Sequence, residues 1–111
     1  MYAYIELWKV KPAWHSLPQE QRQQFFQTVG EEIGNQLGAG AGLVAVARND
    51  ADTSHRADYD FVAVWTIPDR EKGDAFAATW LRVGFHDYFA QEDVRGKMLD
   101  PASFIGAHLA L

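Results

Sequence analysis

The sequence predicts one α+β domain of the ferredoxin-like type, spanning residues 1–111. Three observations lead to this fold class. The length of 111 residues suits a single domain. The hydrophobic share of 48% is typical of a globular chain. The patterned segments follow the order strand, helix, strand, strand, helix, strand, which is the βαββαβ plan of a four-stranded antiparallel sheet with two helices on one face.

The first strand is predicted at residues 3–10, where strand-forming side chains alternate until Pro12. Alternation places its side chains on two different faces. One face carries Ala3, Ile5 and Leu7, and the other carries Tyr4, Glu6 and Trp8.

A helix is predicted from Pro18 to Leu37, with Ser16 as a candidate N-cap. Its apolar side chains recur at helical spacing and form one stripe. The stripe consists of Phe25, Phe26, Val29, Ile33 and Leu37.

The middle of the chain predicts two strands joined by a loop. Residues 43–49 suit a short buried strand, and the polar residues 50–58 suit a loop. Residues 59–67 alternate clearly, with Tyr59, Phe61, Ala63 and Trp65 on one face. Pro68 closes this strand.

The last third of the chain predicts a helix and a final strand. Asp69 is the expected cap of a helix that runs to about Val83, and a short helical segment is expected within residues 85–91. Asp100-Pro101 is expected to break the chain, and the alternation in residues 103–111 predicts the last strand.

This assignment predicts that the small aliphatic strand face meets the helices. The other face then carries large aromatic side chains and is too apolar to remain exposed in a monomer. We therefore expect a homodimer in which two such faces meet. The residues of this second face are Tyr4, Glu6, Trp8, Phe61, Trp65, Phe104 and His108.

Composition excludes several classes of function. The formal net charge of −5 and the lack of a basic run argue against nucleic acid as a partner. The absence of cysteine excludes disulfides and cysteine-based metal sites. No secretion signal is visible at the start and no apolar run suits a membrane span, so the expected location is cytoplasmic.

Glu6 and His108 are the candidate catalytic residues. The first and last strands are neighbours in this fold, so both side chains are expected on one face, where the carboxylate would orient an imidazole that titrates near neutral pH. The alternatives are a buried ion pair or a contact between subunits.

Aromatic residues on the same face are candidates for binding a planar ligand, or for filling a dimer core. His86 is a further ligand-binding candidate, with Asp87 able to orient it. Residues 50–58 begin like a calcium loop but lack the required glycine and glutamate, so no metal site is predicted. The aromatic candidates are Tyr4, Trp8, Phe61 and Trp65.

Residues 84–89 are Gly-Phe-His-Asp-Tyr-Phe, and residues 92–96 are Glu-Asp-Val-Arg-Gly. These segments resemble a family of small bacterial proteins of unknown function, marked by a Gly-Trp-Tyr-Asp-Tyr-Phe block. Phe85 and His86 replace the Trp and Tyr of that block, and residues 92–96 approximate a second family segment. The family resembles the dimeric α+β-barrel superfamily, which includes cofactor-free monooxygenases, lactone isomerases and haem-dependent enzymes. Further matching segments are residues 4–8, 11–14, 48–52 and 55–60.

Together these observations predict a small-molecule-binding homodimer. The first hypothesis is an enzyme without a metal or organic cofactor, of the proton-transfer, isomerase or monooxygenase type, acting on a planar or aromatic metabolite. The alternative is a non-catalytic metabolite-binding protein or a structural dimer.

Overall fold

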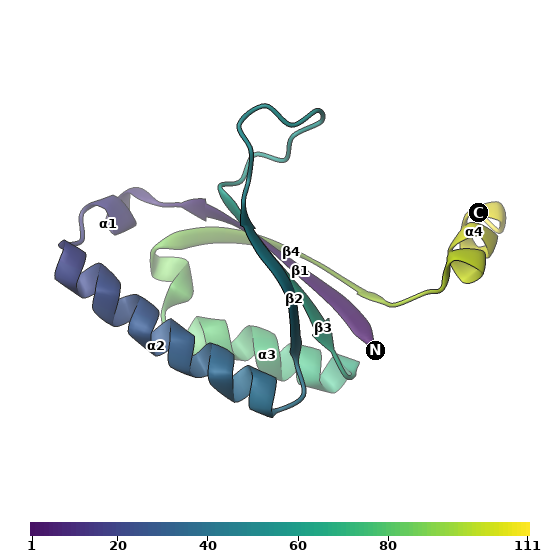
Figure 1. The fold of residues 1–111 in the computed structure, drawn as a ribbon, viewed down its shortest axis with the longest axis horizontal. Coiled ribbons are helices and arrows are strands. Elements are labelled where there is room, and N and C mark those ends of the chain that lie inside the picture. The colour runs from purple at the N-terminus through teal and green to yellow at the C-terminus, as the bar shows by residue number, and fades with distance from the viewer.

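A four-stranded antiparallel sheet with the order β2-β3-β1-β4 frames the computed structural model, which describes residues 1–111 (Figure 1). This order and the helices beside the sheet confirm the predicted ferredoxin-like class. The strands are β1 at Tyr2–Val10, β2 at Gly42–Arg48, β3 at Phe61–Ile67 and β4 at Phe89–Lys97.

Two long helices, α2 (Gln19–Gly38) and α3 (Arg70–Arg82), cover the same face of the sheet. Asp69 caps α3 as predicted, because its side chain accepts a hydrogen bond of 2.8 Å from the Lys72 N–H. Ser16 was expected to cap α2, but Pro18 occupies that position and Ser16 ends the short helix α1 (Pro12–His15).

The two sheet faces are the reverse of those predicted. The large aromatic side chains point at the helices and form the core, where the Trp65 ring packs 4.9 Å from that of Phe76 and the Tyr4 ring 5.1 Å from it. The opposite face is mainly aliphatic, with Glu92 and Thr66 as polar members, and no helix covers it. We call it the open sheet face, defined by Ile5, Leu7, Val62, Val64 and Val94.

The reversal has a steric reason. Rings from the sheet and from α3 interlock edge to face across the layer, so large side chains fill the space under the helices. Of the two helices, α2 contributes little to this layer, since Val29 is its one buried residue. Small aliphatic side chains would leave that space unfilled.

The last strand lies earlier in the chain than predicted. β4 occupies residues 89–97 and pairs with β1 along its whole length, whereas residues 101–109 form a helix, α4. The Asp100 side chain caps α4 through a 2.7 Å bond from the Ser103 N–H, and Pro101 takes its first turn. The Asp-Pro pair that was interpreted as a break therefore starts a helix.

The strand β2 is correctly placed but is not buried. It lies at the edge of the sheet, and Val44 and Val46 are both 63% exposed. The loop after it, predicted at residues 50–58, is confirmed and extends outward from the end of the sheet (Figure 1). Within it Arg56 donates to the Asp50 carbonyl, and Lys9 pairs with Asp58 at 2.7 Å.

Candidate functional site

Glu6 is the buried carboxyl group of the molecule. It stands in the middle of β1, with Ala63 of β3 and Asp93 of β4 as its partners across the ladder. Its side chain faces the helices, among the aromatic core, and the residue is only 3% exposed. A buried carboxyl group needs hydrogen-bond partners, because losing water costs the charged form several kcal/mol.

Two side chains supply those partners. The Trp65 indole N–H donates to Glu6 Oε1 at 2.8 Å, and the Gln91 amide donates to Glu6 Oε2 at 2.9 Å. The same amide nitrogen lies 2.8 Å from Asp93 Oδ1. The Gln91 carbonyl oxygen lies 3.0 Å from His86 Nε2, and since this oxygen can only accept, His86 donates to it.

The contacts from His86 through Gln91 orient the Glu6 carboxyl group from the surface side of the core. His86 fixes the direction in which the Gln91 amide points, and Gln91 then presents its N–H₂ to Glu6. His86 is partly exposed, whereas Glu6 is not. The relay therefore links the buried carboxyl group to a titratable side chain nearer the surface.

The surroundings of Glu6 raise its pKa to about 7. Burial is the main cause, and the negative charge of Asp93 acts in the same direction. The hydrogen bonds from Trp65 and Gln91 lower the pKa but do not offset burial. A carboxyl group in this range changes its protonation state at neutral pH, which is the property of a general acid or base.

A cavity adjoins Glu6 under the sheet, between the core and α2. About 40 Å³ of it is free, enough for one or a few water-sized groups. Its outer rim includes Leu43 and Val46 of the edge strand, which are 37% and 63% exposed. The full lining is Glu6, Trp8, Val29, Ile33, Leu43, Val46, Ala63, Trp65, Trp80 and Phe85.

Two hydrogen-bond donors among the lining residues have no acceptor on the protein. The indole N–H groups of Trp8 and Trp80 are buried and unpaired. Leaving such a donor unpaired costs about 1–3 kcal/mol. Both residues also belong to the cavity that contains Glu6.

The structure brings together part of the predicted site. Trp8 and Trp65 line the Glu6 cavity, and His86 reaches Glu6 through Gln91. Tyr4 lies outside this cavity and donates to Asp93 Oδ2 at 3.1 Å; burial and that carboxylate raise its pKa. Phe61 does not line the Glu6 cavity but two other hollows, which Trp8 also lines.

The predicted pairing of Glu6 with His108 is wrong. His108 lies on α4, is exposed, and its Nδ1 is 2.8 Å from the Phe104 carbonyl oxygen of the same helix. The alternation in residues 103–111 suggested a strand next to β1, but β4 takes that place. The neighbour of Glu6 on the last strand is therefore Asp93.

Sequence reasoning missed Gln91, Asp93 and Trp80 as parts of the site. The two polar residues lie on a strand that was not recognised, so their register against Glu6 could not be derived. Trp80 lies within the helix predicted to run to about Val83, but only the fold shows that it borders the cavity.

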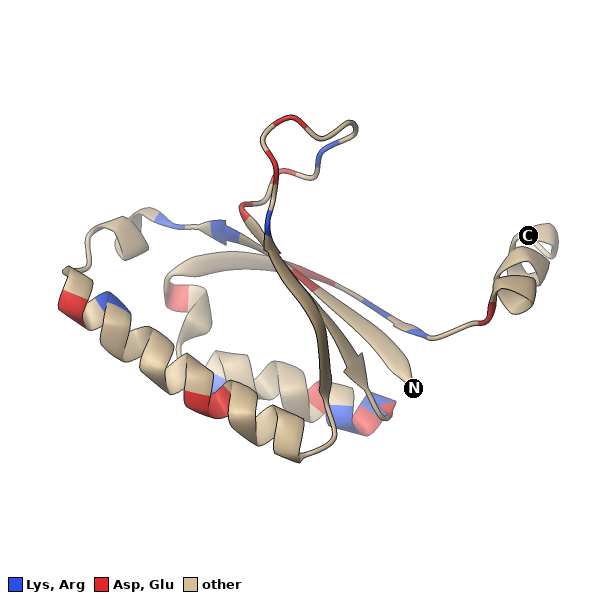
Figure 2. Ribbon diagram, in the orientation of Figure 1, with Lys and Arg blue, Asp and Glu red and all other residues tan.

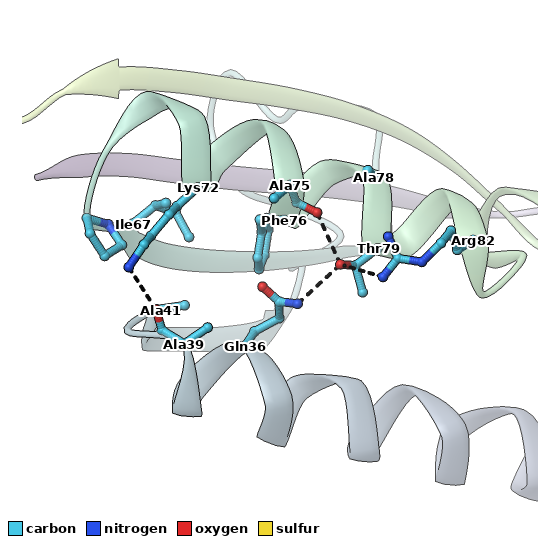
Figure 3. A pocket seen from close by; sticks show the side chains of 11 residues that line it. Gln36, Ala39, Ala41, Ile67, Lys72, Ala75, Phe76, Ala78, Thr79 and Arg82 are labelled. Carbon is cyan, nitrogen blue, oxygen red and sulfur yellow. Dashed lines mark hydrogen bonds between the residues drawn. The ribbon is translucent and has the colours of Figure 1, made fainter.

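A second, wider cleft of about 560 Å³ lies between the end of α2 and α3 (Figure 3). Its polar side chains are bonded to each other: Gln36 donates to the Thr79 hydroxyl at 3.1 Å, and Arg82 reaches the same oxygen at 3.3 Å. Lys72 lies 3.4 Å from the Ala39 carbonyl oxygen. The cleft has no buried ionisable group, so the Glu6 cavity is the stronger candidate.

No cluster of three or more His, Asp or Glu side chains is arranged to hold a metal ion. No helix is both long and apolar enough to cross a membrane.

The fold and the buried carboxyl group define a ferredoxin-like α+β domain with a small internal cavity. The chain belongs to a family of unknown function, DUF6616, whose match covers residues 1–111. This confirms the expected membership of an uncharacterised family. No curated protein matches the sequence.

Solved structures with similar folds include two proteins described as chlorite dismutases. A mutant enzyme from Candidatus Nitrospira defluvii has a TM-score of 0.72 at 13% identity, over 90% of this chain and 40% of that one. The putative chlorite dismutase TA0507 has a TM-score of 0.65 at 18% identity, over 89% and 44%. The present chain thus spans less than half the length of either.

HapK from Hahella chejuensis is similar in length. Its TM-score is 0.53 at 20% identity, over 89% of this chain and 93% of that one. At these identities the likeness establishes the fold alone.

Proposed function

We propose that the protein binds a small, planar, largely apolar molecule in the Glu6 cavity, and that Glu6 exchanges a proton with it. The observation that carries this proposal is that Glu6 is the one ionisable residue among the cavity-lining residues, with a pKa of about 7. A buried group with such a pKa, next to a cavity, is typical of a functional site.

The rest of the lining favours an aromatic ligand that carries an oxygen atom. Indole and phenyl rings supply flat apolar surfaces, and the unpaired N–H groups of Trp8 and Trp80 are suited to an oxygen acceptor. Proton transfer by Glu6 suits an isomerase-type or related reaction and requires no metal or organic cofactor.

A ligand larger than a few atoms requires the cavity to widen. The wall that can move is α2, which contributes one fully buried side chain to the core, next to the exposed edge strand β2. Separation of α2 from β2 would open the cavity at Leu43 and Val46, which already lie at its rim.

Phenol is a suitable first probe, because it is planar and carries one hydroxyl group. In ¹H–¹⁵N NMR spectra, millimolar phenol should shift the amide signals of Ile33, Val46 and Ala63. The shifts should depend on pH between 5.5 and 8.5, because Glu6 changes its charge in that range. Shifts scattered over the surface, or none, would contradict the proposal.

A matched pair of variants tests whether the ligand enters between α2 and β2. Val46→Trp should block the cavity and weaken phenol binding at least tenfold. Val44→Trp is the control, since Val44 is equally exposed on the same strand but does not line the cavity. Equal loss of binding in both variants would place the phenol elsewhere.

We also propose that the protein is a homodimer. The original reason, an exposed aromatic face, no longer holds because helices cover that face. The aliphatic open sheet face supports the proposal instead, since Val94 is 58% exposed and its neighbours are only half-buried. Light scattering at micromolar concentration should give about twice the mass of 12.5 kDa.

A further inference from the structure

The C-terminal helix α4 (Pro101–Leu109) stands away from the rest of the molecule on an extended arm (Figure 1). Every residue from Gly96 to Leu111 is exposed. No residue of α4 is buried, although its side chains are mainly apolar. The exposed large apolar residues of the arm are Met98, Leu99, Phe104, Ile105, Leu109 and Leu111, with Leu109 at 82%.

The helix is also two-sided. At helical spacing its large side chains Phe104, Ile105, His108 and Leu109 share one side, while the small residues Ser103, Gly106 and Ala110 share the other. No charged side chain lies beyond Asp100 (Figure 2). We call the large side chains the α4 stripe.

A helix of this length needs a packing surface. Isolated helices shorter than about 12–15 residues are only marginally stable in water, even with good helix formers. α4 has 9 residues, including a glycine near its middle. Burial of the α4 stripe would stabilise this helix, and its own chain places no surface beside it.

The connection to β4 keeps the arm away from its own sheet. The Met98 N–H donates to the Met1 carbonyl at 3.0 Å, which prolongs the pairing of β4 with β1. Asp100 is held extended by Pro101, with φ of −74° and ψ of 165°. Between the paired Met98 and the extended Asp100, only Leu99 remains to change the direction of the chain. The arm therefore continues outward instead of folding back.

The chain thus carries two apolar surfaces without partners, the α4 stripe and the open sheet face. We propose that α4 of each chain packs its stripe on the open sheet face of a second copy. This inference rests on the proposed homodimer and names the element that forms its contact. A twofold axis makes the exchange reciprocal, so each copy both donates an arm and receives one.

The observations favour a second copy over another partner. The open sheet face is mainly aliphatic, with Glu92 across from Leu7. The α4 stripe is apolar except for His108. Each chain carries one surface of each kind. A twofold dimer covers both at once, whereas a different protein binding the sheet would leave α4 exposed. Burial of the stripe against the open sheet face would cover Phe104, Ile105 and Leu109 of the arm and Val94 of the sheet, all of which are more than half exposed.

Charge substitutions in α4 provide the first part of the test. In sedimentation velocity at micromolar concentration, Phe104→Glu combined with Leu109→Glu should convert the dimer to a monomer and weaken self-association at least a hundredfold. Ser103→Glu combined with Ala110→Glu adds the same charge to the other side of α4 and should leave the dimer intact. Far-ultraviolet circular dichroism should show the sheet unchanged in both.

Cross-linking provides the second part of the test. The chain has no cysteine, so only the introduced thiols react. A Leu109→Cys chain is mixed with a Val64→Cys chain and treated with a short bis-maleimide. A mixed cross-linked dimer is expected. As the control, a Gln27→Cys chain, whose cysteine lies on the outer face of α2, takes the place of the Val64→Cys chain and should give no mixed cross-linked dimer.

The outcomes separate the two proposals. A monomeric wild-type protein overturns both. A dimer that survives the Phe104→Glu and Leu109→Glu changes, without the mixed cross-link, overturns the arm exchange and leaves the homodimer standing. Cross-linking within one chain of a Leu109→Cys and Val64→Cys double variant at high dilution would show that α4 folds onto its own sheet, which also overturns the exchange.

Discussion

Burial of Glu6 costs free energy of folding and at the same time brings the pKa of its carboxyl group into the neutral range. Its position at the centre of β1 places a carboxyl group among aromatic rings, where the charged form loses its water. Donors from Trp65 and Gln91 satisfy both oxygens, yet its pKa still rises to about 7. The residue was recognised from the sequence because a carboxyl group between two aromatic residues on one strand face needs a partner.

The pH dependence of stability should reveal this carboxyl group. A carboxyl group with a raised pKa binds its proton more tightly in the folded state. Stability therefore falls as pH rises from about 4.5 to about 7, by about 3 kcal/mol for this residue. Glu6→Gln should remove that slope in urea unfolding measured from pH 4.5 to 8, whereas Glu20→Gln on the exposed side of α2 should retain it. An unchanged slope in Glu6→Gln would assign the effect to another group.

Gln91 should act on Glu6 as a positioning residue. Its hydrogen bond lowers the pKa of Glu6, so Gln91→Leu should move the titration of the Glu6 carboxyl carbon, followed by ¹³C NMR, to a higher pH. Gln27→Leu on the surface of α2 should leave it unchanged. A shift to lower pH in Gln91→Leu would mean that the relay from His86 does not support the charged form.

At the scale of elements, the sequence patterns placed β1, α2, β2, β3 and α3 to within a few residues, because alternation or a helical stripe marks each of them. β4 escaped recognition because charged residues interrupt its alternation, as is common at sheet edges. The short α4 was mistaken for a strand because a nine-residue apolar segment fits both periods.

The cap of α3 offers a test at this scale. Asp69→Ala removes the acceptor for the Lys72 N–H and should lower the free energy of unfolding by about 1 kcal/mol. Asp52→Ala, in the exposed loop after β2, should change it much less. Urea denaturation of both variants at one pH gives the comparison. A loss as large in Asp52→Ala would point to a general charge effect.

For the whole molecule, the important question is which face of the sheet the helices cover. The covered face contains the cavity next to Glu6, and the other face stays open to association. Alternation along β1 and β3 separated the two residue sets correctly, whereas Phe104 and His108, assigned to the aromatic set, lie on α4. Alternation could not say which set the helices cover, because both sets are mainly apolar. The space between the sheet and the helices must be filled by side chains, and the large aromatic set fills it. The cavity next to Glu6 thus lies inside one chain, and the aliphatic set stays uncovered on the open sheet face.

This division predicts that association and core packing respond to different substitutions. Val64 lies on the open sheet face, paired with Ile5 across the ladder, so Val64→Lys places its charge on the surface of a monomer but inside a dimer. The wild-type melting temperature should rise with protein concentration, because association stabilises the folded state by mass action. In Val64→Lys that dependence should vanish while the amide signals around Ala63 and Trp65 stay in place. Gln27→Lys, on the helical side, should behave as the wild type. A wild-type melting temperature independent of concentration, in the range where dimer and monomer coexist, would show that the open sheet face does not depend on a second chain.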